Sequence, residues 1–560
     1  MKMKQKKKHL IVGAIAGSIL LILIIILIIV KLVSKKETIR SLKGQINLIY
    51  DIQSKTKKTI FIGEEFKKGS NDFDIFINGE LVEKYTKEYQ FNSTGKNIVQ
   101  LKLYTNLNMD YMFKKVEDLK AVEMISNGKC QIISMISTFE NCDNLESFNI
   151  TGFDASQLKS MHKLFYKSGL ELYTYQQFNT YNLEDISYMF SFSHISEFLF
   201  NEFNMKKVSN MSHMFEGCSS LLKVETNGVN TESVIDMSYL FKGLSSIKSL
   251  EINDFDTTRV KDMSHMFEDC FSISQLDINN LDTKNVEDMS YMFTNCYSLS
   301  TIDISKFDTT NLKNMSHMFQ YCVILSNLNF EKFKIVKVED TSYLFASCRQ
   351  LKEIDISKFD LSNNKDMSHM FFECNLLEII NYGNINTEKV ENMDNLFQQC
   401  QSLKSIDLSK FNTKNVLSMS NMFKDCTKLK EIDVSKFNTE KVQNMSRMFE
   451  GCLEITSLDV SHFNTKQVKD MTKMFEYCPL TSLNLESFDT SNVISMLDMF
   501  SEMKKITSLD VSKFNTKNVK DMAGMFYDCN SLNELKVSNL IPQMLKIFHI
   551  LFMVVKVLNH

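Results

Sequence analysis

Apolar residues recur with a single period over most of this chain. Cysteine marks the period most clearly, because successive cysteines lie 26 residues apart from Cys270 to Cys478. Steps of 25 or 26 residues extend the marks back to Val116 and forward to Cys529, which gives 17 marked positions. One shortened step follows Cys478, at Pro479. A fixed period of this length is the sequence signature of a repeat protein.

Within one unit the apolar pattern changes from strict alternation to a wider spacing. Ile302 and Ile304 enclose a polar residue, as expected of a β-strand. From Leu312 to Phe319 the apolar positions fall three or four apart, which predicts a short helix or helical turn. Such a unit cannot bury its own apolar face, so the copies must stack. We therefore expect an α/β solenoid over residues 105–539, with about 17 turns, a parallel sheet along one side and short helical turns along the other.

Residues 34–104 precede the array and also alternate apolar and polar positions. Asn78-Gly79 within them is a hairpin signal. The open end of a solenoid exposes its core, so a cap is expected there. We predict a spacer and a small β cap that shields the first unit.

The N-terminal segment predicts a membrane anchor. Leu10 to Val30 are 21 residues without a charge, long enough as a helix to span the roughly 30 Å hydrocarbon core. Five lysines within residues 1–9 favour a cytoplasmic tail. We predict a transmembrane signal anchor over 10–33, with the array outside, at the plasma membrane or cell surface. A cleaved signal peptide is the alternative, but the apolar region is long for one.

Two further features concern the ends of the chain. Gly13 and Gly17 have the spacing of a helix-pairing motif, which would permit a dimer through the anchor. Residues 540–560 lose the repeat and turn apolar. If one thymine is restored at the Leu540 codon, AT-rich codons allow this tail to be read as the repeat consensus. Its cysteine then falls 26 residues after Cys529, so we predict an aberrant tail produced by a frameshifted repeat, with a second membrane helix as the alternative.

Composition adds limits on chemistry. The formal net charge is −4, so no overall basic field indicates nucleic acid as a partner. Twelve of the 13 cysteines share one repeat position, where a small buried thiol would fill the corner of each unit. Stacked neighbours could also approach disulfide distance. The chain has no C-x-x-C pair, so we expect no zinc site.

A row of aspartates and serines is the best candidate binding surface. The aspartates lie between the two buried strand positions of successive units, and a serine follows two residues later. Calcium binding is one interpretation, and a solvated face neutralised by nearby lysines is the one that we favour over metal. For protein binding this row is the best candidate, since the exposed sheet of a solenoid is broad and ordered. The candidate ridge consists of Asp277, Asp303, Asp355, Asp407, Asp433, Asp459, Asp510, Ser305, Ser357, Ser409, Ser435, Ser461 and Ser512.

Other candidate residues have weaker claims. His265, His317 and His369 recur in alternate units, about two strand spacings apart, so a solvated role is favoured over shared ligation. No nucleophile elbow, phosphate loop or carboxylate pair appears, so we expect neither enzyme activity nor a cofactor. The possible glycosylation sites are Asn92, Asn149, Asn210, Asn314 and Asn444.

The phrase IDISKFDTTNLKNMSHMFQYC has near-copies throughout the array, such as LDVSHFNTKQVKDMTKMFEYC ending at Cys478. It resembles the BspA-like leucine-rich-repeat surface proteins, in the 26-residue variant with the M-F-x-x-C signature. The early units around Ser168 and Ser193 depart from the pattern. The resemblance implies a leucine-rich-repeat-like fold, surface exposure, and adhesion to or recognition of a protein, host or extracellular ligand. The alternatives are an intracellular membrane-tethered scaffold for protein interactions and a non-functional gene remnant.

Overall fold

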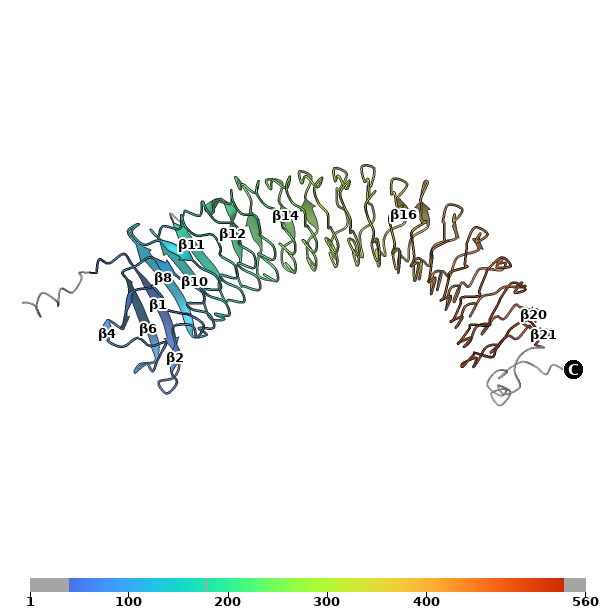
Figure 1. The fold of residues 1–560 in the computed structure, drawn as a ribbon, viewed down its shortest axis with the longest axis horizontal. Helices are drawn as coiled ribbons and strands as arrows, with labels where there is room; N and C mark the ends of the chain where they lie inside the picture. The colour runs from blue at the N-terminus through green and yellow to red at the C-terminus, as the bar shows by residue number, and fades with distance from the viewer. Residues whose placement is uncertain (1–39, 177–178, 538–560) are drawn as a thin grey trace, which may run out of the picture.

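The computed structural model describes residues 40–176 and 179–537. They form a long solenoid that curves into an arc, with the largest β-sheet at its N-terminal end (Figure 1). The array has about 16 turns, which is the number of intervals that 17 marked positions enclose. Each turn lies directly against the next, because equivalent residues pair at a separation of 25 or 26.

The N-terminal sheet joins the cap to the solenoid. Its order is β11-β10-β8-β1-β6-β3-β4. The strands are β1 (Gly44–Ile52), β3 (Phe73–Ile77), β4 (Glu80–Val82), β6 (Gly95–Leu103), β8 (Leu119–Ser126), β10 (Ser147–Thr151) and β11 (Leu172–Gln176). Pairing is antiparallel from β4 to β8 and parallel from β8 onward. The cap thus covers the otherwise unpaired edge of the first parallel strand, an edge that would template aggregation if left open.

The cap hairpin forms at the predicted turn. Asn78 (φ 48°) and Gly79 (φ 90°) connect β3 to β4. Positive φ at both central residues is the requirement of the tight hairpin turn that matches strand twist. Two short antiparallel strands, β2 (Thr59–Ile60) and β5 (Glu88–Tyr89), pair beside this sheet.

Short parallel strand pairs run along one side of the array. They are β12 (Glu197–Leu199) with β13 (Lys223–Glu225), β14 (Ser249–Glu251) with β15 (Gln275–Asp277), β16 (Glu353–Asp355) with β17 (Ile379–Asn381), β18 (Ser405–Ile406) with β19 (Glu431–Ile432), and β20 (Ser508–Asp510) with β21 (Glu534–Lys536). The remaining pair, β7 (Leu107–Asn108) with β9 (Ile132–Ser134), lies on the other side, at the start of the second ladder. A second ladder consists of single parallel bridges, for example Asp262 with Asp288 and Asp288 with Asn314. The bridge ladder is continuous from Ser160 to Asp521, whereas each strand pair joins only two neighbouring turns, so the predicted parallel sheet is interrupted along the array.

The prediction of helical turns was wrong. The segment from Met315 to Phe319 is a series of tight turns, in which His317 has a φ of 59°. The His317 N–H donates to the Ser342 carbonyl at 2.8 Å and the Phe319 N–H to the Leu344 carbonyl at 3.0 Å, both in the next turn of the solenoid. These donors are therefore unavailable for the bonds to residue i−4 that an α-helix requires. Within the described residues, the 3-10 turn η1 (Phe200–Glu202) is the only helical element.

The core is organised around one column of stacked phenylalanines. The column has one Phe per turn from Phe113 to Phe526, and consecutive ring centroids are 5.3–6.0 Å apart. The rings are nearly parallel, with 15° between Phe293 and Phe319. Each turn therefore buries its ring against its two neighbours, which is how a unit without a core of its own becomes stable.

Buried hydroxyl and thiol groups also connect successive turns. The Thr413 hydroxyl donates to the Asn438 carbonyl at 2.9 Å and accepts from the Asn438 N–H at 2.7 Å. The Cys322 thiol donates to the Phe293 carbonyl at 3.1 Å. Both residues are fully buried, and equivalent bonds recur along the array. These contacts satisfy polar backbone groups that would otherwise be costly to bury.

The predicted anchor finds no support. The segment 10–33 and the aberrant tail 540–560 both lie outside the described residues. Over residues 40–176 and 179–537, no helix has the length and apolar character needed to cross a membrane. The prediction of a single-pass protein at the plasma membrane or cell surface is therefore not supported, and the function proposed below does not depend on it.

Candidate binding surface on the strand side

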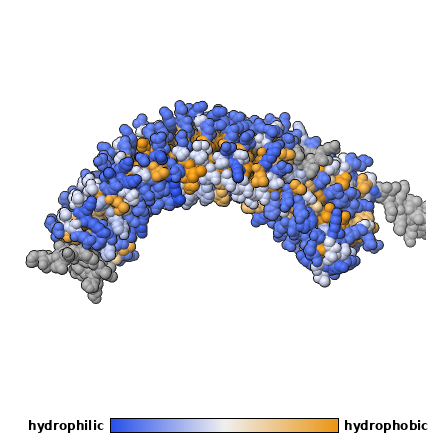
Figure 2. Space-filling view, turned by 180° about the vertical axis from the view of Figure 1, so that it is seen from behind, coloured by the Kyte–Doolittle hydropathy of each residue, from blue (hydrophilic) through white to orange (hydrophobic). Residues whose placement is uncertain are grey.

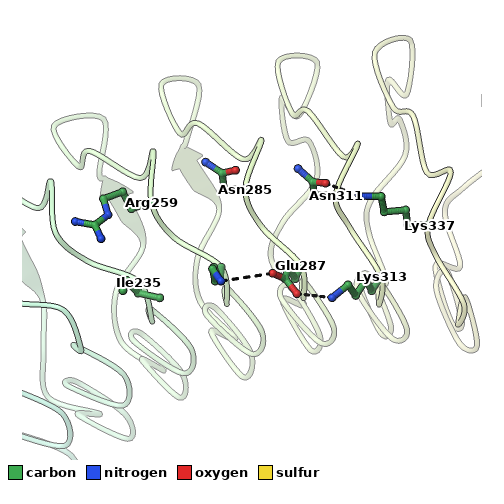
Figure 3. A pocket seen from close by; sticks show the side chains of 8 residues that line it. Ile235, Arg259, Asn285, Glu287, Asn311, Lys313 and Lys337 are labelled. Atoms are coloured by element: carbon green, nitrogen blue, oxygen red, sulfur yellow. Dashed lines mark hydrogen bonds and ion pairs between the residues drawn. The ribbon is translucent and has the colours of Figure 1, made fainter.

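The array has two flat sides that differ in chemistry. Each unit has a strand segment on one side and a segment of the single-bridge ladder on the other. Ile304 follows the strand segment, Leu312 precedes the bridge segment, and both are fully buried in the core between the two segments. The exposed side chains of the two segments therefore point away from each other. We call the side formed by the strand segments the strand face. The opposite side is the bridge face (Figure 3). It is formed by the exposed residues one and three positions before each residue of the single-bridge ladder, such as Glu287 and Asn285 before Asp288.

The predicted ridge lies on the strand face. Asp303 is exposed, and its Oδ1 accepts the Ser305 N–H at 2.9 Å. The same bond recurs for the other ridge aspartates that a serine follows, at 2.8–3.0 Å. Hydrogen bonds from the Ser305 side chain and N–H hold the pKa of Asp303 below its usual value. One oxygen of each of these aspartates thus closes the turn after the strand. The second oxygen is already engaged at Asp355, where it accepts from Asn381 Nδ2 at 2.9 Å, and at Asp510, where it lies 3.5 Å from Lys536 Nζ.

A groove of about 500 Å³ crosses the ridge at β14, β15 and the next two turns. Leu250, Leu276 and Ile302 form its apolar floor, and Leu250 and Ile302 are only 3% and 9% exposed. Its rim carries three carboxylates and no basic residue. The rim residues include Glu251, Asp277, Asp303, Asn279, Asn327 and Asn329. An apolar floor within a polar rim is the usual anatomy of a recognition site.

The surface as a whole is mostly hydrophilic. Figure 2 shows one flat side of the arc, where apolar patches lie among polar side chains along the solenoid. Among the apolar side chains most exposed are Ile379, at 60%, and Leu222, at 64%. These two side chains lie six turns apart, so they are single exposed residues and not one patch.

Comparison with protein families gives one match. The family model described as "Mycoplasma protein of unknown function, DUF285" matches repeatedly, in overlapping segments that together span residues 79–550. The segments are 79–199, 107–223, 133–249, 191–301, 220–323, 272–381, 367–478 and 452–550. The chain belongs to the DUF285 family. No curated protein matches it.

The cysteines of the DUF285 array are structural. All 13 are free and buried, which confirms the expectation of buried thiols. Burial raises the pKa of Cys322 and of Cys374 to about 12. Such thiols carry almost no thiolate at neutral pH and are poor nucleophiles and ligands. Within the described residues, no three His, Cys, Asp or Glu side chains gather so as to hold a metal ion.

His265, His317 and His369 are part-buried in a stack of aromatic rings, which corrects the expectation of a solvated role. His265 lies between Tyr239 and Tyr291, with ring centroids 4.2 and 4.5 Å away. The stack continues in alternation from Tyr188 to His369 along one edge of the turns. Desolvation by burial lowers the pKa of His369 to about 4. Tyrosine at the same repeat position in the intervening units was the signal that sequence reasoning missed.

The possible glycosylation sites fall into two groups. Asn92 and Asn149 have exposed side chains. Asn314 lies at a bridge position, where its Oδ1 accepts the Ser316 N–H at 3.0 Å and the Ser316 hydroxyl at 2.9 Å. Asn210 and Asn444 make the same pair of bonds. In these three sites the asparagine and the serine of the acceptor motif are committed to the turn.

Proposed function

We propose that the DUF285 array is a non-catalytic recognition module that binds a protein segment in the groove of the strand face. The observation that carries this proposal is the combination of the Leu250, Leu276 and Ile302 floor with a rim whose charged residues are all carboxylates. An extended segment with alternating apolar and basic side chains fits such a groove. Its apolar groups would bury against the floor, and its lysine or arginine side chains would meet Asp277 and Asp303.

Three observations support a binding role rather than catalysis. The ridge aspartates are exposed or half-exposed, and hydrogen bonds to serine hold the pKa values of Asp303 and Asp355 below their usual value. The thiols are buried and protonated. The resemblance to BspA-like leucine-rich-repeat proteins also favours recognition of a partner. A catalytic site would instead need a perturbed acid, base or nucleophile within reach of a cleft.

The test uses peptides displayed on phage, selected against the immobilised full chain. We expect enrichment of peptides that combine Lys or Arg with Leu, Ile or Phe. The double variant Asp277→Asn and Asp303→Asn should lose this binding. Asparagine keeps the turn, because Asn484 occupies the same repeat position and accepts the Glu486 N–H at 3.0 Å. The variant therefore removes charge without removing the hydrogen bond.

The matched control is Asp459→Asn, the same exchange at a ridge position outside the groove. It should leave peptide binding unchanged. Selected peptides without basic residues, or equal binding to the double variant, would contradict the proposal.

Adhesion to a host or extracellular protein and scaffolding inside the cell are two uses of the same surface. Protease treatment of intact cells distinguishes them. Release of peptides from residues 105–539 supports adhesion. Protection until the cells are lysed supports the scaffold.

A further inference from the structure

The bridge face holds a basin whose charge is opposite to that of the strand-face groove. Its volume is about 460 Å³, and Arg259, Lys261, Lys313 and Lys337 line it together with a single acid, Glu287 (Figure 3). Four positive charges and one negative charge leave a net charge of +3. This contrasts with the formal charge of −4 for the whole chain, so the basin is a local feature.

The three lysines of the basin are positioned by bonds to neighbouring turns. Asn311 donates to the Lys284 carbonyl at 2.9 Å, and its Oδ1 accepts from Lys337 Nζ at 2.7 Å. Glu287 pairs with Lys313 at 2.5 Å and with Lys261 at 3.8 Å. The Arg259 guanidinium makes no ion pair or hydrogen bond with the described part of the chain. An arginine held open beside three lysines is suited to a carboxylate or sulfate, which it can bind through two parallel bonds.

The basin can also accept a hydrogen bond from a hydroxyl group of a ligand. Asn285 donates to the Thr258 carbonyl at 2.7 Å, which fixes the orientation of its amide. Its Oδ1 faces the basin without a partner among the described residues and can accept from a hydroxyl group. No aromatic ring lines the basin, so it offers no platform on which nucleobases could stack.

The arrangement repeats farther along the same face. A second basin of about 360 Å³ has Lys365, Lys389 and Lys441 around Glu391. Lys389 bonds to Asn363 Oδ1 at 2.6 Å, as Lys337 does to Asn311. Turns follow one another at roughly 4.8 Å. Glu339 lies between the two basins, where it pairs with Lys365 at 2.7 Å. A linear ligand with anionic groups spaced to pass this carboxylate would contact both basins at once, and two linked contacts bind more tightly than either alone.

We propose that the bridge face binds a linear acidic polysaccharide, whose carboxylate or sulfate groups pair with Arg259, Lys313 and Lys337 and whose hydroxyl groups bond to Asn285. This site lies on the opposite side of the core from the groove of the proposed function and is independent of it. Glu287 opposes binding, because it already neutralises Lys313 and Lys261. We therefore expect substitution of Glu287 to strengthen binding, and substitution of Arg259 or Lys313 to weaken it.

The experiment measures binding of the full-length chain to immobilised heparin and to hyaluronate at low ionic strength. Arg259→Gln and Lys313→Gln should each weaken binding, on the order of fivefold, and Glu287→Gln should strengthen it about threefold. Raising the salt should abolish binding in every variant. The matched controls are Lys358→Gln and Glu353→Gln, equal charge changes on exposed strand-side residues, and neither should alter binding.

Three results would overturn the proposal. The first is no binding to either glycan, or binding that Arg259→Gln and Glu287→Gln leave unchanged. The second is equal binding of single-stranded DNA, which would assign the face to polyanions in general. The third is salt-sensitive self-association in sedimentation velocity that the same variants abolish, which would assign the face to a second copy of the chain.

Discussion

Replacing Phe345 with alanine tests whether the phenylalanine column holds the array together. Phe345 is completely buried, and its ring centroid lies 6.0 Å from Phe319, 5.6 Å from Phe371 and 5.7 Å from Phe330. Deletion of a buried phenyl ring costs about 3–5 kcal/mol, and the cost rises when the site cannot collapse. Two flanking rings fixed by inter-turn backbone bonds prevent collapse, so we expect the upper part of that range.

The quasi-one-dimensional architecture determines where this loss appears. Each turn contacts only its neighbours, so a defect at Phe345 weakens two interfaces and leaves those farther away intact. In a urea titration followed by hydrogen exchange and mass spectrometry, we expect protection to be lost first around residues 319–371. The two flanking parts of the array should then unfold separately, whereas the wild-type chain should lose protection there only at higher urea.

Phe345→Leu is the control, because leucine keeps most of the buried volume and should cost less than about 1.5 kcal/mol. The reasoning is refuted if Phe345→Ala unfolds at the wild-type urea concentration. It is also refuted if the exchange pattern changes equally over the whole array, because stability would then not be transmitted from turn to turn.

Three further predictions follow from the inter-turn contacts. Thr413→Val should lower the free energy of unfolding by about 1–3 kcal/mol, because it removes both hydrogen bonds to Asn438. Thr413→Ser should stay near wild type, and urea titration measures the free energy of unfolding of both variants. Burial raises the pKa of Cys374 to about 12, and all 13 thiols are buried. A thiol reagent at pH 8 should therefore label the folded chain hardly at all and label all 13 sites after denaturation. Fast labelling of the native chain would contradict the burial. The pKa of His369 is about 4 in the folded chain and about 6.5 in the unfolded chain, so the unfolded chain binds the proton first as the pH falls. The stability contributed by neutral His369 is therefore present above pH 6.5 and lost as the pH falls towards 4. His369→Gln should make the melting temperature less dependent on pH over that window.

The resemblance to surface proteins and the DUF285 match agree on a repeat array, and the geometry adds a groove and a basin whose lining residues carry opposite charge. The strand-face ridge could be anticipated, because a polar residue between two buried strand positions must point outward. Its second role was not anticipated. The bonds from Asp303 and Asp355 to the serines two residues later show that the ridge aspartates also form the turns.

The sequence by itself determined the period, the alternation of buried and exposed residues on the strand side, the Asn78-Gly79 hairpin and the buried Phe and Cys positions, because all of these follow from local spacing and side-chain polarity. The tertiary structure decided the rest. A three- and four-residue apolar spacing suits a helix, but the His317 and Phe319 N–H groups bond to the next turn, and no single unit could reveal that partner. The same stacking brings Tyr239 onto His265 and collects Arg259, Lys313 and Lys337 from separate turns. Local pattern fixes which side chains are buried, and the contacts between turns fix backbone conformation and the grouping of charges.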